Sequence, residues 1–313
     1  MYSIGVDIGG MSIKIGIVDE FGKILYKTSF KTERNPTVAI DAIAKQIQKL
    51  LNENNIVIQN IKGIGVGCPG AVNGKLGIID FLPNLDWENV EIGKILRTYF
   101  DTEIKISNDA NVAALGEAIH GCAKQFNSVI MFTLGTGVGG GIIIDKKLFE
   151  GEFSRGAELG HTTLILNGES CTCGRKGCVE CYTSATALIK QTKLAMEKNK
   201  NSKMWQYANN DINNVDGKTA FECAKQGDIA AVEVVDKYVY YLGESILNML
   251  NIFRPEAFII GGGISNAGDY LINKLKEYCE KASYGYKKAP KTQILKASLG
   301  NDAGIIGASL LVN

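Results

Sequence analysis

The sequence lacks long apolar runs and carries almost no net charge. None of its uninterrupted hydrophobic stretches reaches the length of a membrane-spanning helix, and 34 Lys and Arg against 33 Asp and Glu leave a formal charge of +1. Without a basic surplus, neither nucleic acid nor an anionic membrane is an expected partner. Residues 1–7 read as a strand and show no basic segment followed by an apolar stretch, so we expect a cytoplasmic protein.

Two common nucleotide-binding signatures are also missing. The chain contains no GxxxxGK[ST] motif, and no GxGxxG that opens a helix with an acidic residue further on. A nucleotide must therefore be held by a different arrangement. A disulfide framework is not expected either, because a chain of 313 residues without a secretory signal can bury a large hydrophobic core instead.

Histidine is rare, and the cysteines are unevenly spread. One of the two histidines and three of the eight cysteines fall between His161 and Cys178, among glycines rather than apolar residues. One histidine with three cysteines closes the tetrahedral shell of a structural Zn²⁺ ion, which predicts such a site at His161, Cys171, Cys173 and Cys178. Cys181 forms a second CxxC with Cys178, so the spacing alone also allows an all-thiolate site without His161.

The hydrophobic pattern predicts an α/β protein. Short apolar runs that end at glycine or polar turns indicate strands, and Asn35 before Pro36 is typical of the start of an amphipathic helix. Residues 199–216 are polar and read as an exposed connection. The expected strands are 2–7, 13–18, 23–30, 62–67, 103–107 and 256–260. One expected helix begins at Pro36. The others cover 90–100, 110–119, 184–198, 218–226, 228–252, 269–281 and 303–312.

Two glycine-turn hairpins are related by a shift of 126 positions. The shift places Asp7-Ile-Gly9-Gly10 on Thr133-Leu-Gly135-Thr136, and Ile17-Val-Asp19 on Ile143-Ile-Asp145, without a gap. Matching units of this kind indicate a duplicated fold of two lobes around a central cleft, with a hinge near residues 118–125. The expected small lobe comprises residues 1–118 with 300–313, and the large lobe comprises residues 119–299.

Three glycine turns end strands and predict a polyphosphate site. Glycine lets backbone N–H groups approach an anion closely, and three such turns in one chain favour a bound nucleotide polyphosphate over ligand-free hairpins. Asp7 begins the first turn and would orient Mg²⁺ through water, although an Asp here can also cap its own turn. The residues expected at the nucleotide are Asp7, Gly9, Gly10, Ser12, Lys14, Thr133, Gly135, Thr136, Gly137, Gly261, Gly262 and Gly263.

Asn108-Asp109 follows an expected strand and opens an expected helix. Such a pair often only caps the helix. Beside a nucleotide, however, Asp109 can accept the proton of a hydroxyl group during phosphoryl transfer. Asn108, Glu158, His161 and Glu180 carry groups suited to the neighbouring hydroxyls of a sugar, and His161 can use one ring nitrogen for a metal and the other for a ligand.

Together these motifs resemble the ROK family of sugar kinases and sugar-sensing repressors. The resemblance implies an actin-like, hexokinase-like (ribonuclease H-like) two-lobe α/β fold with a duplicated β-hairpin-plus-sheet core, ATP with Mg²⁺, and transfer to the 6-hydroxyl of a hexose. The segments that carry it run in order over nearly the whole chain. They are Asp7-Ile-Gly-Gly10, Gly67-Cys-Pro-Gly-Ala-Val-Asn73, Asn108-Asp109, Thr133-Leu-Gly-Thr-Gly-Val-Gly-Gly-Gly141, Glu158-Leu-Gly-His161, the residues 171–180, and Gly261-Gly-Gly263.

The same resemblance implies roles for single residues. Asp109 would be the general base, and His161 rather than Cys181 would complete the zinc site. A homodimer or homotetramer is implied as well. The family usually has a hydroxyl residue after the two glycines of the first hairpin, where this chain has Met11, and strand alternation points Ser12 the other way. The implied sugar contacts are Gly70, Asn84, Asn108, Asp109, Glu158, His161 and Glu180.

The sequence therefore predicts an ATP-dependent hexose kinase, in the first place a glucokinase. Kinases for N-acetylmannosamine, N-acetylglucosamine, fructose, allose or β-glucosides are the alternatives within the family. A sugar-sensing repressor would carry a DNA-binding helix-turn-helix ahead of this region, and the first expected strand here begins at residue 2. A catalytically inactive sugar-binding protein would fit Met11 but not the Asn108-Asp109 pair.

Overall fold

The computed structural model describes residues 1–285, 288 and 290–313. These residues form two compact units that differ from the expected lobes at residues 119–127, 141–157 and 298–299. Among them, no helix is both long and apolar enough to cross a membrane. Unit 1 comprises Met1–Asn127, Gly141–Ala157 and Ser298–Asn313, and unit 2 comprises Ser128–Gly140 and Glu158–Ala297.

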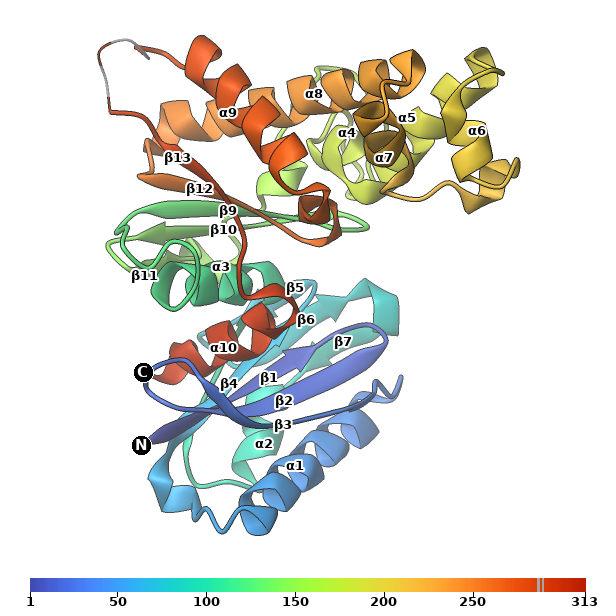
Figure 1. Cartoon of the computed structure of the whole chain (residues 1–313). Helices are drawn as coiled ribbons and strands as arrows, with labels where there is room; N and C mark the ends of the chain where they lie inside the picture. The colour runs from blue at the N-terminus through green and yellow to red at the C-terminus, as the bar shows by residue number, and fades with distance from the viewer. Residues whose placement is uncertain (286–287, 289) are drawn as a thin grey trace. The chain divides into compact units, whose positions relative to one another are not determined.

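The sheet of unit 1 consists of β1 (Tyr2–Ile8), β2 (Ser12–Val18), β3 (Ile24–Lys31), β4 (Ile61–Cys68) and β8 (Glu103–Asn108). Its order is β3-β2-β1-β4-β8, with β1 antiparallel to β2 and parallel to β4 (Figure 1). Strands covered on both faces are apolar along most of their length, and β4 buries every residue except Lys62. The predicted N-terminal strands are confirmed.

Helices cover both faces of this sheet. Helix α1 (Pro36–Glu53) starts where the Asn35 side chain accepts hydrogen bonds from the backbone N–H groups of residues 37 and 38, and its isoleucines pack on those of β1 and β2. Helix α10 (Ala303–Ser309) packs on the other face. There a Cβ at Gly5 would lie 1.9 Å from the carbonyl oxygen of Ile305, and one at Gly65 would lie 1.8 Å from that of Ala308. Only glycine allows so close an approach.

A small antiparallel sheet in unit 1 escaped sequence-based prediction. It consists of β5 (Ala71–Asn73), β6 (Ile78–Leu82) and β7 (Trp87–Val90) in that order. Strands this short show little alternation. The helix expected over 90–100 is correspondingly shorter, because α2 covers only Ile92–Arg97, whereas α3 (Asp109–Ile119) matches its prediction closely.

The second sheet repeats the strand order of the first. It contains β9 (Val129–Leu134), β10 (Val138–Ile144), β11 (Lys147–Phe149), β12 (Ala257–Gly261) and β13 (Gln293–Lys296), in the order β11-β10-β9-β12-β13. In unit 2, β12 runs parallel to both β9 and β13. The hairpin β10–β11 continues into unit 1, where a Cβ at Gly141 would lie 2.4 Å from the Cβ of Ala114 on α3. The corresponding strand orders confirm the duplication.

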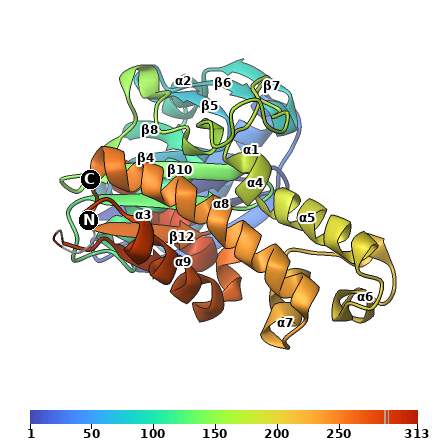
Figure 2. The ribbon, with the colours of Figure 1, turned by 90° about the horizontal axis from the view of Figure 1, so that it is seen from above.

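The helices of unit 2 include the long helix α8 (Ile229–Phe253), which lies along α9 (Asp269–Ala282) and α5 (Ala185–Lys198) (Figure 2). The others are α4 (Glu180–Thr183), α6 (Lys203–Tyr207) and α7 (Thr219–Lys225). The prediction of an exposed connection over 199–216 is only partly right. Helix α6 lies within it, and Met204 is fully buried. The Asp228 carboxylate accepts hydrogen bonds from Ser202 and from the backbone of Lys203 at the start of this helix.

The side chain of Glu117 joins two segments of unit 1, the one that follows α3 and the one that leads into α10. This fully buried carboxylate accepts hydrogen bonds from the backbone N–H groups of Cys122 at 3.0 Å and of Ser298 and Leu299 at 2.7 Å each. Glu117→Ala would leave these donors buried and unpaired. We expect a loss of about 3 kcal/mol in the free energy of unfolding, measured by chemical denaturation.

A matched control is available in the same unit. Glu103 is exposed and forms a surface ion pair with Lys105, so Glu103→Ala is expected to change the free energy of unfolding by less than about 0.5 kcal/mol. Equal denaturation midpoints for the two variants would contradict the role assigned to Glu117.

Candidate active site

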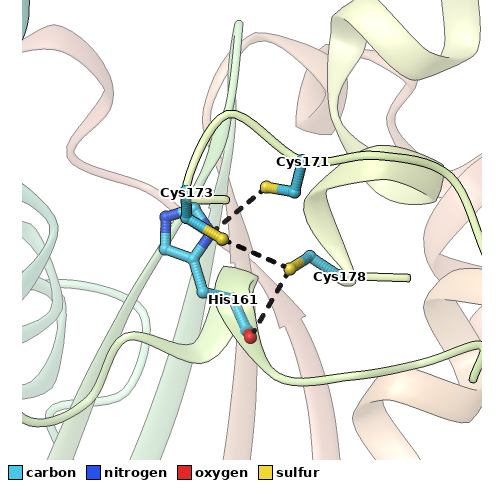
Figure 3. A group of neighbouring side chains, drawn as sticks. All are labelled: His161, Cys171, Cys173 and Cys178. Atoms are coloured by element: carbon cyan, nitrogen blue, oxygen red, sulfur yellow. Dashed lines mark hydrogen bonds between the residues drawn. The ribbon is translucent and has the colours of Figure 1, made fainter. Parts of the chain in front are cut away.

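Four predicted metal ligands come together in unit 2. The ligand atoms of His161, Cys171, Cys173 and Cys178 all lie within 4.8 Å of one another. The Sγ atom of Cys171 is 3.6 Å from Nδ1 of His161, and the Sγ atoms of Cys173 and Cys178 are also 3.6 Å apart (Figure 3). A tetrahedral zinc ion with ordinary Zn–S and Zn–N lengths has ligand-to-ligand edges of about 3.6 to 3.8 Å. The donor set therefore fits structural Zn²⁺.

The backbone of the metal loop explains its glycines. Gly174 and Gly177 have positive φ angles of 87° and 76°, and a Cβ at Gly177 would lie 1.6 Å from the carbonyl oxygen of Ile165. The Sγ atom of Cys181 points to the carbonyl oxygen of Ser170 at 3.6 Å, outside the four-residue group. The arrangement favours the set that contains His161 over the all-thiolate alternative.

Two predicted sugar-binding carboxylates lie beside this cluster. Burial raises the pKa of Glu158, the nearby imidazole of His161 opposes that rise, and the negative charge of Glu180 adds to it. Glu180 begins α4, and its Oε1 atom is 3.8 Å from Sγ of Cys171. Unit 2 thus brings Glu158, His161 and Glu180 into one electrostatic group.

The remaining predicted residues near the sugar lie in unit 1, and all but Asn84 are at or just beyond the carboxyl ends of the parallel strands β4 and β8. Asn108 pairs with Cys68 across β4 and β8. Its side chain donates to the carbonyl oxygen of Gly70 at 3.1 Å and accepts from the backbone N–H of Ala110 at 2.9 Å, so it does cap α3. Gly70 has a positive φ of 84°, a backbone conformation that favours glycine. Asp109 is the first residue of α3, and its charge adds to the effect of burial in raising the pKa of the Cys68 thiol.

The first glycine turn of unit 1 carries Asp7 at its base. Burial raises the pKa of the Asp7 carboxyl, and Lys14, whose Nζ atom is 3.3 Å from Oδ2, opposes that rise. Asn84 is exposed and lies next to the turn, since a Cβ at Gly10 would be 3.8 Å from its own. Met11 is 87% exposed, so the tip of this hairpin presents a thioether where the family usually has a hydroxyl.

The second and third glycine turns lie side by side in unit 2. Thr133 pairs with Gly261 across β9 and β12, and Gly262, with a φ of 76°, packs directly on the backbone of Leu134. Beyond the third turn is a cavity of about 450 Å³, lined by Gly263 and by residues of α7 and its surroundings, among them Lys218. Sequence reasoning missed this cavity, because its walls come from segments that are far apart along the chain.

A larger cavity, of about 880 Å³, lies in unit 1, and none of these residues lines it. Its charged lining is already paired, as in the 2.6 Å ion pair between Lys75 and Glu152. Size alone therefore does not identify the site.

The comparisons with known proteins place the whole chain in one family. The sequence model of the ROK family matches residues 3–313. The chain belongs to the ROK family. It is 35% identical to a glucokinase of Streptomyces coelicolor over 98% of this chain and 96% of that protein. It is also 29% identical to a xylose repressor of Bacillus spizizenii, over 99% of this chain and 77% of the repressor.

A solved structure agrees with this membership. The ROK family glucokinase of Streptomyces griseus, crystallised with glucose and AMPPNP, superimposes with a TM-score of 0.83 at 33% identity, covering 99% of both chains. The predicted hexokinase-like α/β fold with a duplicated core is thereby confirmed for this ROK protein.

Proposed function

We propose that this ROK protein is an ATP-dependent hexose kinase that phosphorylates glucose at its 6-hydroxyl. The observation that carries the proposal is the grouping of Glu158, His161 and Glu180 around the metal cluster in unit 2. The Asn108-Asp109 pair at the end of the unit 1 sheet supports it. The likeness to a glucokinase that was crystallised with glucose and a nucleotide analogue supports it further.

Asp109 is the general base of the proposed reaction. Its carboxylate accepts the proton of the 6-hydroxyl as that oxygen bonds to the γ-phosphorus of ATP, the bond to the bridging oxygen breaks, and ADP leaves. The side-chain amide of Asn108 donates one N–H to the carbonyl oxygen of Gly70, and its second N–H can donate to an adjacent hydroxyl of the sugar. Glu158 and Glu180 accept hydrogen bonds from further hydroxyls, and a carboxylate at each place favours a pyranose rich in donors.

His161 serves both the metal and the sugar. Its Nδ1 atom faces the cysteine sulfurs, so Nε2 stays available to a hydroxyl of the sugar. Zinc with four protein ligands has no open position and supplies loop order rather than an activated water. His161, Cys171, Cys173 and Cys178 would hold it.

The glycine turns and the cavity beside the third turn would hold ATP. Backbone N–H groups of the turns face the phosphates, and the cavity lined by Gly263, Lys218 and Tyr207 has room for the base. Mg²⁺ would neutralise charge on the phosphates, with Asp7 holding its water ligands.

A coupled assay of ADP formation over a panel of hexoses tests this function. We expect glucose to give a kcat/KM at least about tenfold above those for fructose, allose, N-acetylglucosamine and N-acetylmannosamine, because a pocket shaped for one hydroxyl pattern rejects analogues by a few kcal/mol. A different preferred hexose would overturn the glucose assignment alone. ADP formation that no sugar stimulates would overturn the kinase assignment.

A sugar sensor without catalysis is the second candidate, favoured by the likeness to a xylose repressor. The same panel separates the two candidates. A sensor would bind a sugar measurably by calorimetry and yet give no sugar-dependent ADP formation.

A further inference from the structure

The second glycine turn, at residues 135–138, is hydrogen-bonded to the segment that follows the metal cluster. Within unit 2, the Oε2 atom of Glu180 accepts a hydrogen bond from the backbone N–H of Val138 at 2.9 Å. The backbone N–H of Ala185 donates to the carbonyl oxygen of Gly135 at 2.8 Å. The hydroxyl of Thr186 donates to the carbonyl oxygen of Thr136, also at 2.8 Å. Residues 180–186 thus contact three positions of one short turn.

Glu180 lies directly against this turn. A Cβ at Gly137 would be only 2.3 Å from its Oε2 atom. Its other oxygen is 3.8 Å from Sγ of Cys171 in the metal cluster. One carboxylate therefore contacts both the metal loop and the turn expected to hold phosphate.

We propose that Glu180, assisted by Thr186, is a positioning residue for the phosphate-binding turn at residues 135–138. This inference rests on the proposed function, which assigns the turn to ATP. A carboxylate that accepts a backbone N–H forms a charge-assisted hydrogen bond, and such bonds hold a glycine-rich turn in one conformation. Because Glu180 contacts both the metal loop and this turn, an ordered metal loop keeps the turn ordered as well. The phosphate-binding turn is therefore in place before any sugar binds.

The test uses the sugar-free full chain and needs no turnover. Calorimetry measures the Kd of AMPPNP with Mg²⁺, and hydrogen–deuterium exchange measures the backbone N–H of Val138. Glu180→Ala should weaken AMPPNP binding about tenfold and speed exchange at least about tenfold, because a bond to a charged group is lost. Thr186→Val should weaken AMPPNP binding about threefold.

Two further variants separate positioning from sugar binding. Glu180→Gln keeps an oxygen that accepts from Val138 and loses only the charge assistance, so its AMPPNP affinity and exchange should stay within about threefold of the wild type. Glu158→Ala removes the other sugar-facing carboxylate, which has no side-chain hydrogen bond to the turn among the described residues, and AMPPNP affinity should again be unchanged.

The inference is overturned if Glu180→Ala matches Glu180→Gln in both exchange and AMPPNP affinity. If Glu180→Ala fails to fold by circular dichroism, unchanged AMPPNP affinity in Thr186→Val overturns it instead. A wild type that binds no AMPPNP contradicts the proposed function, and the exchange of Val138 in the variants still decides whether Glu180 orders the turn.

Discussion

Asp109→Asn is expected to lower kcat about a thousandfold while the Kd for glucose changes less than about threefold. Asparagine keeps the size of the side chain and its place at the first position of α3, but it accepts a proton far more weakly than a carboxylate. General-base catalysis contributes on the order of 10² to 10⁴ to a rate, and that contribution would be lost. Steady-state turnover and glucose calorimetry on the same preparation measure the two quantities.

The control for this variant is Asp101→Asn, which removes an exposed carboxylate in the turn before β8. Its turnover should equal that of the wild type. Turnover of Asp109→Asn within tenfold of the wild type would remove Asp109 from the role of base, and a parallel loss of glucose binding would instead assign it to substrate binding.

Cys173→Ser is expected to abolish zinc binding and to weaken sugar binding strongly. Cys173 is exposed, so the substitution costs little packing, and the loss follows from the missing thiolate. Structural zinc contributes about 10 kcal/mol or more to the order of small zinc loops, so its loss frees the segment that carries His161 and Glu180. We expect the wild type to contain equimolar zinc by elemental analysis, and the variant to bind glucose at least about a hundredfold more weakly.

Cys181→Ser is the matched control for the metal site. Cys181 follows the cluster closely in the sequence, and its sulfur lies 3.6 Å from the carbonyl oxygen of Ser170, but it is not one of the four residues whose ligand atoms lie within 4.8 Å of one another. This variant should retain both zinc and glucose binding. Purified wild type without zinc, or zinc lost from Cys181→Ser and kept by Cys173→Ser, would contradict the assignment.

Local patterns predicted much of the fold and the grouping of the four metal-ligand candidates. The cysteine spacing fixes most of a small loop, and the four predicted ligands do lie together. Strands β1, β2 and β4 were evident because strands buried on both faces are continuously apolar. The strand order of the second sheet bears out the duplication that two short matches indicated.

Contacts between distant segments were not predictable. Nothing in the pattern around Glu180 indicates that it accepts from the backbone of Val138, 42 positions earlier. Likewise Gly5 and Gly65 read as ordinary strand glycines until α10, from the other end of the chain, is placed against them. The short strands β5 and β6 carry too few residues for their alternation to stand out.

The most direct test of the kinase assignment is ³¹P and ¹³C NMR of the wild type with ATP, Mg²⁺ and glucose labelled at carbon 6. The account predicts a phosphomonoester signal coupled to the labelled carbon, with an equal amount of ADP and no inorganic phosphate. Inorganic phosphate without a coupled carbon signal, or unchanged ATP beside bound glucose, would contradict it.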